Sequence, residues 1–265
     1  MPRSIGTRSP SVIDESLTHE PSIDRINFLI FAADNTTMIP YIMYVIKNVS
    51  DETERNRIYD YLESYIVRRL ICKRSTNNYS DLFSESLINA DVKTADDLKS
   101  YFDAKDPTNA LAMPTDAEVL RCVMECEYPI YRIRTILYLM ESRLRDNPMY
   151  TTQLLKYSAY TLEHLMPQKW WVNWPLPEGG SQDERNHLVK TLGNCTIITQ
   201  SLNSTISNDQ WSVKLDGKNG KGGLRMYASG LLTLDGVLTL NEWNETTIQE
   251  RSRKLAELAC SKWNY

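Results

Sequence analysis

Glycine and tryptophan are confined almost entirely to one half of this 265-residue chain. Gly6 is the only glycine before residue 179, whereas the other nine lie between Gly179 and Gly236. All six tryptophans fall at or after Trp170. Glycine permits tight turns and close backbone approaches but weakens helix interiors. The division therefore predicts a glycine-poor helical part followed by a mixed, loop-rich part.

The first part carries repeated helix start signals, each followed by apolar residues at helical spacing. We expect helices to begin at Ser22, Pro40, Asp51, Thr94 and Thr115, and a further helix over residues 130 to 144. In the long helix after Asp51, one face is expected to carry Ile58, Leu62, Tyr65 and Arg69. Helices packed on helices should therefore fill this part of the chain.

The expected fold class is α+β, mostly α. Residues 1–20 are polar and aperiodic and are expected to be a flexible tail. We divide the remainder into a helical domain over residues 21–150 and a second domain over residues 151–265, closed by a helix that runs from about Asn241 to Trp263. The length of the chain is ample for one or two domains with real cores.

Composition excludes several classes of protein. No apolar run reaches 18 residues and the N-terminus lacks a secretory signal, so no membrane span and a cytoplasmic location are expected. The five cysteines contain no C-x-x-C pair, which argues against a disulfide framework and a structural zinc. Cys122 and Cys126, four residues apart on a predicted helix, are either two core thiols or a shared ligand pair.

Two stretches in the second part carry the chemistry. The first, Thr161-Leu-Glu-His-Leu-Met-Pro-Gln168, places Glu163 beside His164 and ends a short element, because Pro167 cannot continue a helix or a central strand. The second, residues 192–208, starts at Gly193, continues as an apolar strand and then enters a polar helical segment. The order strand, long loop, strand, helix predicts a ββα unit.

These two stretches resemble the HNH-like, or His-Me finger, nuclease region at the C-terminus of GmrSD-type restriction endonucleases. The resemblance rests on Glu-His-Leu-Met-Pro-Gln, on Leu-Gly-Asn-Cys-Thr-Ile-Ile and on Leu-Asn-Ser-Thr-Ile-Ser-Asn-x-x-Trp-x-x-Lys, in that order over residues 161–214. It implies a ββα-metal nuclease domain that acts on foreign, often modified, DNA. It also implies a nucleotide-hydrolysing sensor domain or subunit, and no motif for such a domain occurs in this sequence.

The resemblance assigns roles to five residues. His164 is the expected general base, because imidazole titrates in the right range, although a core histidine bonded to backbone is the alternative. Asn194 would orient the loop that carries this histidine. Glu163 and Asn203 would bind one Mg²⁺ or Mn²⁺, since hard oxygen ligands suit these ions. Lys214 would bring positive charge to the scissile phosphate, unless it is an ordinary surface lysine.

Other features of the second part have open interpretations. Asn208 is either an accessory residue near the metal or a helix cap, and His187 either binds phosphate or metal or lies exposed in a long loop between Gln168 and Lys190. The tryptophan-rich run over residues 170–174 either stacks on bases or pins that loop to the core. The Gly217–Gly223 stretch is either a loop that approaches phosphate or a plain hairpin turn.

Two functions fit these observations. The first is a metal-dependent DNA endonuclease that acts as the effector of an anti-phage restriction system. The second is a non-catalytic helical module that binds nucleic acid or regulates a partner subunit. A net charge of −4 and the absent sensor domain keep the second function open, because phosphate neutralisation by a DNA-cutting protein needs clustered cations. Between residues 183 and 225, however, basic residues slightly outnumber acids, and the intact set of His164, Asn194 and Asn203 favours the first.

Overall fold

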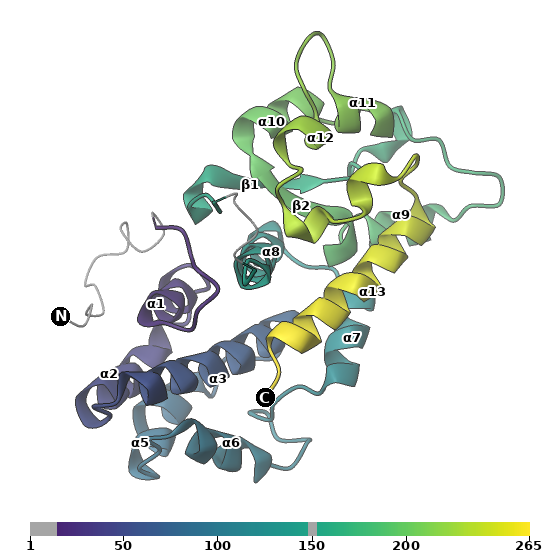
Figure 1. Cartoon of the computed structure of the whole chain (residues 1–265). Coiled ribbons are helices and arrows are strands. Elements are labelled where there is room, and N and C mark those ends of the chain that lie inside the picture. Colours follow the sequence, from purple (N-terminus) through teal and green to yellow (C-terminus); the bar gives the residue numbers. More distant parts are fainter. Residues whose placement is uncertain (1–14, 148–152) are drawn as a thin grey trace.

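The computed structural model describes residues 15–147 and 153–265. Helices form most of it, and the strands β1 (Tyr160–His164) and β2 (Cys195–Thr199) form one small antiparallel sheet. The N-terminal helices form one end of the molecule, and the sheet with its short helices forms the other (Figure 1). The expected fold class, α+β and mostly α, is therefore confirmed.

The N-terminal end consists of consecutive helices joined by short connections. The structure gives them these bounds: α1 (Ile23–Phe31), α2 (Ile39–Asn48), α3 (Glu52–Ile71), α4 (Tyr79–Asp81), α5 (Leu87–Asn89), α6 (Ala95–Asp103), α7 (Asp116–Glu125) and α8 (Ile130–Leu144). A π-helical turn over Leu82–Ser86 joins α4 to α5.

The predicted helix starts are confirmed with local differences in capping. Thr94 and Thr115 both form complete capping boxes, in which the threonine hydroxyl accepts from the backbone three residues on and the acidic side chain returns the contact. Asp51 caps α3 by accepting from the amide of Thr53, without the expected reciprocal contact from Glu54. The Glu54 carboxylate instead accepts from the amide of Ala95 at 2.7 Å, which ties α6 to α3.

The chain does not begin with a free tail as far as residue 20. Leu17 is buried in the core, and its amide donates to the hydroxyl of Tyr138 on α8. The carbonyl of His19 accepts from the Arg143 guanidinium at 3.1 Å. Residues 17 to 19 are thus held against α8, and the rest of the expected tail, residues 1–14, lies outside the described residues.

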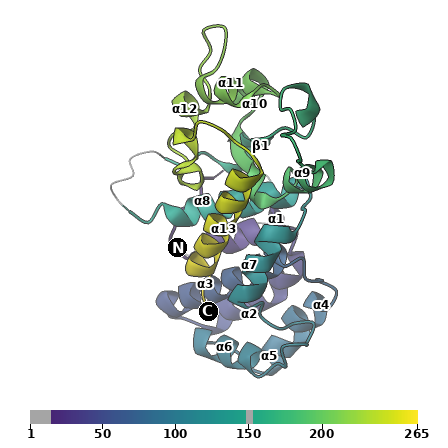
Figure 2. The same cartoon turned by 90° about the vertical axis from the view of Figure 1, so that its right-hand side faces the viewer.

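Helix α13 (Glu245–Lys262) joins the two ends of the molecule. It runs from the small sheet down to the N-terminal helices and packs along α7 (Figures 1 and 2). The predicted closing helix is therefore confirmed, with Ile248, Leu255 and Ala259 buried on one face. Trp263 at its end is fully enclosed and donates its indole N–H to Glu63 of α3 at 2.9 Å.

Glu63 is the centre of a buried ionic network. Its carboxylate accepts from Arg25 of α1 at 2.6 Å and from Arg143 of α8 at 3.0 Å, besides the indole of Trp263. Burial by itself raises the pKa of Glu63, but the two guanidinium groups outweigh it and hold that pKa at about 2. Four helices that are distant in sequence are thus fixed on one carboxylate.

Candidate active site

The site is built on the two-stranded sheet and the helix that follows β2. In the antiparallel register Glu163 lies opposite Thr196 and His164 lies opposite Cys195. His164 is therefore the last residue of β1, and it pairs with the first residue of β2. Helix α10 (Gln200–Ile206) follows β2 directly, and the Thr199 side chain caps it. The order strand, strand, helix that the sequence predicted is present in the structure.

The His164 imidazole is half-buried, and its Nε2 atom lies 3.1 Å from the side-chain amide nitrogen (Nε2) of Gln168. It is therefore not a core histidine bonded to backbone. Burial, with a smaller contribution from the nearby Lys214 ammonium, lowers the pKa of His164 to about 4. The ring is consequently neutral near pH 7, but this pKa lies well below the range expected from the sequence, so His164 is a weaker proton acceptor than an ordinary imidazole.

Glu163 points away from His164 into the protein, as strand alternation predicts. Its carboxylate forms an ion pair with Lys214 of α11 (Trp211–Asp216), and the Lys214 ammonium also donates to the carbonyl of His164 at 2.8 Å. Lys214 has no solvent-exposed surface, so the alternative of an ordinary surface lysine is wrong. Burial raises the pKa of Glu163 and lowers that of Lys214, because it penalises the charged form of each.

Asn194 clamps the segment that follows the histidine. It is fully buried, and its side-chain oxygen accepts from the amide of Met166 at 2.8 Å and from the indole of Trp243 at 2.9 Å. Its side-chain nitrogen donates to the carbonyl of Met166 at 2.8 Å and to that of Val189 at 3.0 Å. All the hydrogen-bonding capacity in the plane of this amide is used, and it ties Met166, in the turn after His164, to Val189 and Trp243.

Helix α13 packs against the backbone on both sides of Asn194. The Arg251 guanidinium donates to the carbonyls of Gly193 at 2.7 Å and Cys195 at 2.8 Å, on either side of Asn194. Gly193 packs so closely on the helix that an added Cβ would lie 2.0 Å from the Ser252 hydroxyl and 2.6 Å from the carbonyl of Ile248. Glycine at this position therefore permits the contact between helix and clamp.

Asn203 lies on α10, half-buried beside β1. Its side-chain nitrogen donates to the carbonyl of Leu162 at 2.9 Å, two residues before His164. Since this bond uses the nitrogen, the carbonyl oxygen of the amide is left for another partner. Asn203 thus lies beside the strand that carries both Glu163 and His164, while the side chains of these two residues point to opposite faces of that strand.

His187 and Asn208 belong to other surroundings. The predicted loop between Gln168 and Lys190 contains helix α9 (Gln182–Leu188), and on it the His187 Nδ1 lies 3.3 Å from a carboxylate oxygen of Glu127. The prediction that Asn208 caps a helix is wrong, because Gln210 occupies the N-cap of α11. Asn208 is exposed and accepts through its carbonyl from Asn173.

Two contacts to the site residues were missed by sequence reasoning. Gln168 reaches the His164 ring from four residues further along the chain, and it belongs to the motif that drew attention to this region. Trp243 reaches Asn194 from 49 residues away. Nothing in the local sequence around Trp243 indicates that contact, because only the packing of α13 brings the two together.

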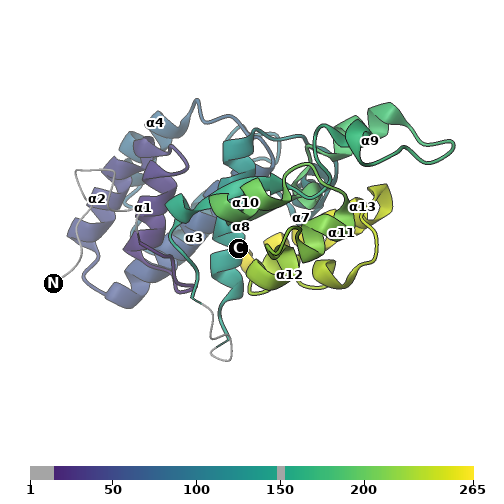
Figure 3. The same ribbon diagram turned by 90° about the horizontal axis from the view of Figure 1, so that it is seen from above.

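The tryptophan run mainly pins the chain to the core. Trp170 and Trp174 are buried, with indole N–H groups that donate to Asn186 at 2.9 Å and to the carbonyl of Asp209 at 3.1 Å. The glycine-rich stretch forms a tight turn, in which the amide of Lys221 donates to the carbonyl of Lys218 at 2.9 Å. Helix α9 and the loop before it extend from the body of the molecule (Figure 3), and the glycine-rich turn extends beyond α11 at the sheet end (Figures 1 and 2).

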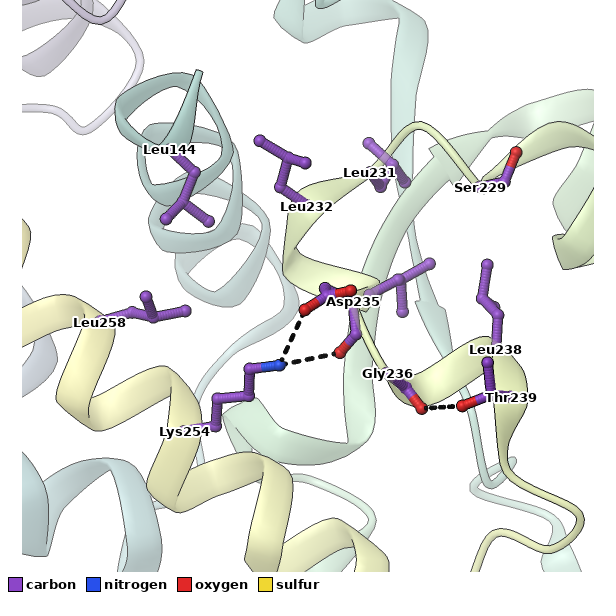
Figure 4. Close-up of a pocket in the computed structure, with 11 residues that line it drawn as sticks. Leu144, Ser229, Leu231, Leu232, Asp235, Gly236, Leu238, Thr239, Lys254 and Leu258 are labelled. Carbon is purple, nitrogen blue, oxygen red and sulfur yellow. Dashed lines mark hydrogen bonds and ion pairs between the residues drawn. The ribbon is translucent and has the colours of Figure 1, made fainter. Parts of the chain in front are cut away.

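One cavity in the second part is not lined by His164. A pocket of about 490 Å³ opens between the end of α8, residues 229–239 and α13 (Figure 4). At its wall the Lys254 ammonium lies 3.1 Å from the carbonyl oxygen and 3.2 Å from a carboxylate oxygen of Asp235. A second cleft of about 560 Å³ is lined by Met166, Trp211 and Trp243 and thus adjoins the turn after the histidine.

The carboxylate and imidazole groups are too few for a conventional protein metal cage. Within residues 15–147 and 153–265, no group of three or more His, Cys, Asp or Glu side chains is placed to hold a metal ion. The two oxygen ligands expected from the sequence are the Asn203 amide, on α10 beside β1, and the Glu163 carboxylate, which faces away from His164 and is engaged by Lys214. These hard donors suit Mg²⁺ or Mn²⁺, with water completing the coordination.

Fold and site together define a mostly helical protein whose small hairpin presents one neutral histidine above an amide-clamped turn. The profile of the GmrSD restriction endonucleases, C-terminal domain, matches residues 114–258, more than half of the chain. The chain belongs to this family, and its class is that of the nucleases of restriction systems. No curated protein matches it.

The family match begins just before α7, earlier than the predicted boundary near residue 150. Helix α7 lies along α13 and α8 packs on both strands, while both helices also contact α3. Neither α7, α8 nor any other helix among the described residues is long and apolar enough to cross a membrane.

Proposed function

We propose that the chain is a metal-dependent DNA endonuclease of the His-Me finger type and the effector of a restriction system. The observation that carries the proposal is His164, which stands at the end of β1 as a neutral, half-buried imidazole with its following turn fixed by Asn194. A neutral imidazole can take a proton from water without first losing one of its own, although a pKa of about 4 makes it a weaker base than one that titrates near pH 7.

In the proposed reaction, His164 takes a proton from the water that attacks the phosphodiester phosphorus. Asn194 acts as a positioning residue, because two of its hydrogen bonds hold Met166 in the turn after the histidine and two anchor the amide to Val189 and Trp243. Lys214 also positions, since its enclosed ammonium holds the Glu163 carboxylate and the His164 carbonyl. Its enclosure does not support the direct phosphate contact expected from the sequence.

Asn203 and Glu163 would hold the Mg²⁺ or Mn²⁺ ion. When bound, the ion stabilises negative charge on the phosphate and on the leaving oxygen. The side-chain oxygen of Asn203 supports this assignment, because the hydrogen bond to Leu162 uses only the nitrogen of the amide. The Glu163 carboxylate would have to release Lys214, or bind the ion and Lys214 at the same time. Glu163 is thus the weaker ligand of the two.

The proposed setting follows from the family resemblance. The proposed substrate is foreign or modified DNA. We assign its recognition to a nucleotide-hydrolysing sensor domain or subunit that acts with this chain in the cytoplasm. We propose that the N-terminal helices are the part of the chain through which that sensor domain or subunit controls the nuclease. Their buried network around Glu63 makes them a rigid support and supplies no group to the site.

The test is nicking of supercoiled plasmid by the full chain with Mg²⁺, Mn²⁺ or EDTA. His164→Ala should slow nicking by about 10²- to 10⁴-fold, as loss of a general base does. His187→Ala is the matched control, because that histidine is half-exposed and paired with Glu127 away from the hairpin. Wild-type nicking by a folded His164→Ala protein would remove the histidine from the mechanism.

A further inference from the structure

Two large apolar side chains lie exposed just after the site histidine. Trp171 is 62% exposed and Val172 is 64% exposed, in the single turn Trp170–Val172 between β1 and α9. Leaving a tryptophan in water forgoes a large burial energy. Adjacent exposed apolar side chains of this kind mark candidate interaction surfaces, and these two follow His164 closely in the chain.

The exposed pair is held on a fixed base. Trp170 is buried beneath it, with the Arg185 guanidinium 5.0 Å from its ring centroid and Asn186 bonded to its indole. The Trp171 ring meets the Trp170 ring edge to face at 6.0 Å. After the pair, the side chain of Asn173 donates to the carbonyl of Asn208 at 2.9 Å. The turn is therefore fastened on both sides of the residues it displays.

The pair also lies within reach of the reacting bond. Gln168 contacts the His164 ring at 3.1 Å, and Trp171 is three residues further along the chain. Three residues span at most about 11 Å of backbone, which is less than the roughly 12 Å width of the DNA major groove. The backbone of Trp171 therefore lies within about one groove width of Gln168, which contacts His164. Lys169, between the two, is exposed and available to a phosphate.

We propose that Trp171 and Val172 form an apolar wedge that packs against DNA bases beside the bond cut at His164. Aromatic side chains bind bases by stacking, and apolar residues enter opened base steps and kink the duplex. Such contact is insensitive to sequence and to ionic strength, and it adds affinity that a chain of net charge −4 cannot draw from phosphates alone. The proposal rests on the proposed nuclease function.

The experiment measures binding of the full chain to a fluorescein-labelled 20-base-pair duplex by anisotropy in EDTA, so that no cleavage occurs. Trp171→Ala should raise Kd by about 5- to 150-fold, the range found when a base-stacking aromatic is removed. Trp171→Phe should recover part of the loss, since it keeps an aromatic face. Met43→Ala, at an exposed apolar position of α2, is the control and should bind as wild type does.

The outcomes separate this wedge from the nuclease proposal. A Trp171→Ala protein that binds DNA like wild type overturns the wedge, while His164-dependent nicking would still stand. A change in oligomeric mass on Trp171→Ala, seen by light scattering, would assign the pair to a contact between protein copies and overturn the wedge. Failure of the wild-type chain to bind DNA would do the same. A raised Kd without a change in mass supports the wedge.

Discussion

Replacing Asn194 by alanine tests whether one buried amide supports both the fold and the site. The side chain is fully buried and forms four hydrogen bonds, each between 2.8 and 3.0 Å. Alanine would leave two donors without a partner, the amide of Met166 and the indole N–H of Trp243. It would also leave two acceptors, the carbonyls of Met166 and Val189.

The size of the effect follows from these orphaned groups. Each buried polar group left unpaired costs about 1–3 kcal/mol, but neighbouring losses do not add fully because the cavity relaxes and can admit water. We expect the free energy of unfolding to fall by about 3–5 kcal/mol. That is a large part of the roughly 5–15 kcal/mol that stabilises a typical domain.

The assay is urea denaturation of the full chain, followed by tryptophan fluorescence. Asn203→Ala is the matched control, because that half-buried amide makes one hydrogen bond, to the carbonyl of Leu162, and its loss should cost about 1 kcal/mol. If Asn194→Ala shifts the unfolding free energy no more than Asn203→Ala does, the clamp is not what positions the turn after His164.

Three further predictions follow from the structure. Asn203→Ala should raise the Mg²⁺ concentration needed for half-maximal nicking more than it raises Kd for DNA in EDTA; an unchanged metal midpoint would remove it as a ligand. Gly193→Ala should lower the melting temperature, since its Cβ would collide with Ser252, and Ser252→Ala should recover part of the loss in the double variant. Glu63 has a folded-state pKa of about 2, below its ordinary value near 4.5, so the stability it contributes is fully present above pH 4.5 and lost as pH falls towards 2. Glu63→Gln should abolish that part of the acid dependence in melting curves, and an unchanged acid limb would contradict the assignment.

Local patterns in the sequence determined the elements. The capping boxes at Thr94 and Thr115 predicted the starts of α6 and α7, because a cap is formed by residues three apart in the chain. The residues around His164 and Asn194 likewise predicted two strands and the helix after the second one, since strand length and the position of proline are local properties.

The sequence did not predict α9, because its polar residues form no continuous apolar stripe. It also left the environment of Lys214 open. A lysine between a valine and a leucine can face solvent or protein, and only the packing of α11 against β1 decides for burial and for the pairing with Glu163.

Tertiary structure alone decided which distant groups meet. Glu63 lies 200 residues from Trp263, and Asn194 lies 49 residues from Trp243, yet each pair shares a hydrogen bond of 2.9 Å. Burial made these bonds obligatory, because a carboxylate or an indole N–H removed from water has to find a partner in the protein. The sequence specified the elements and the reactive residues through local chemistry, whereas the choice of partners depended on how α13 packs across both ends of the molecule.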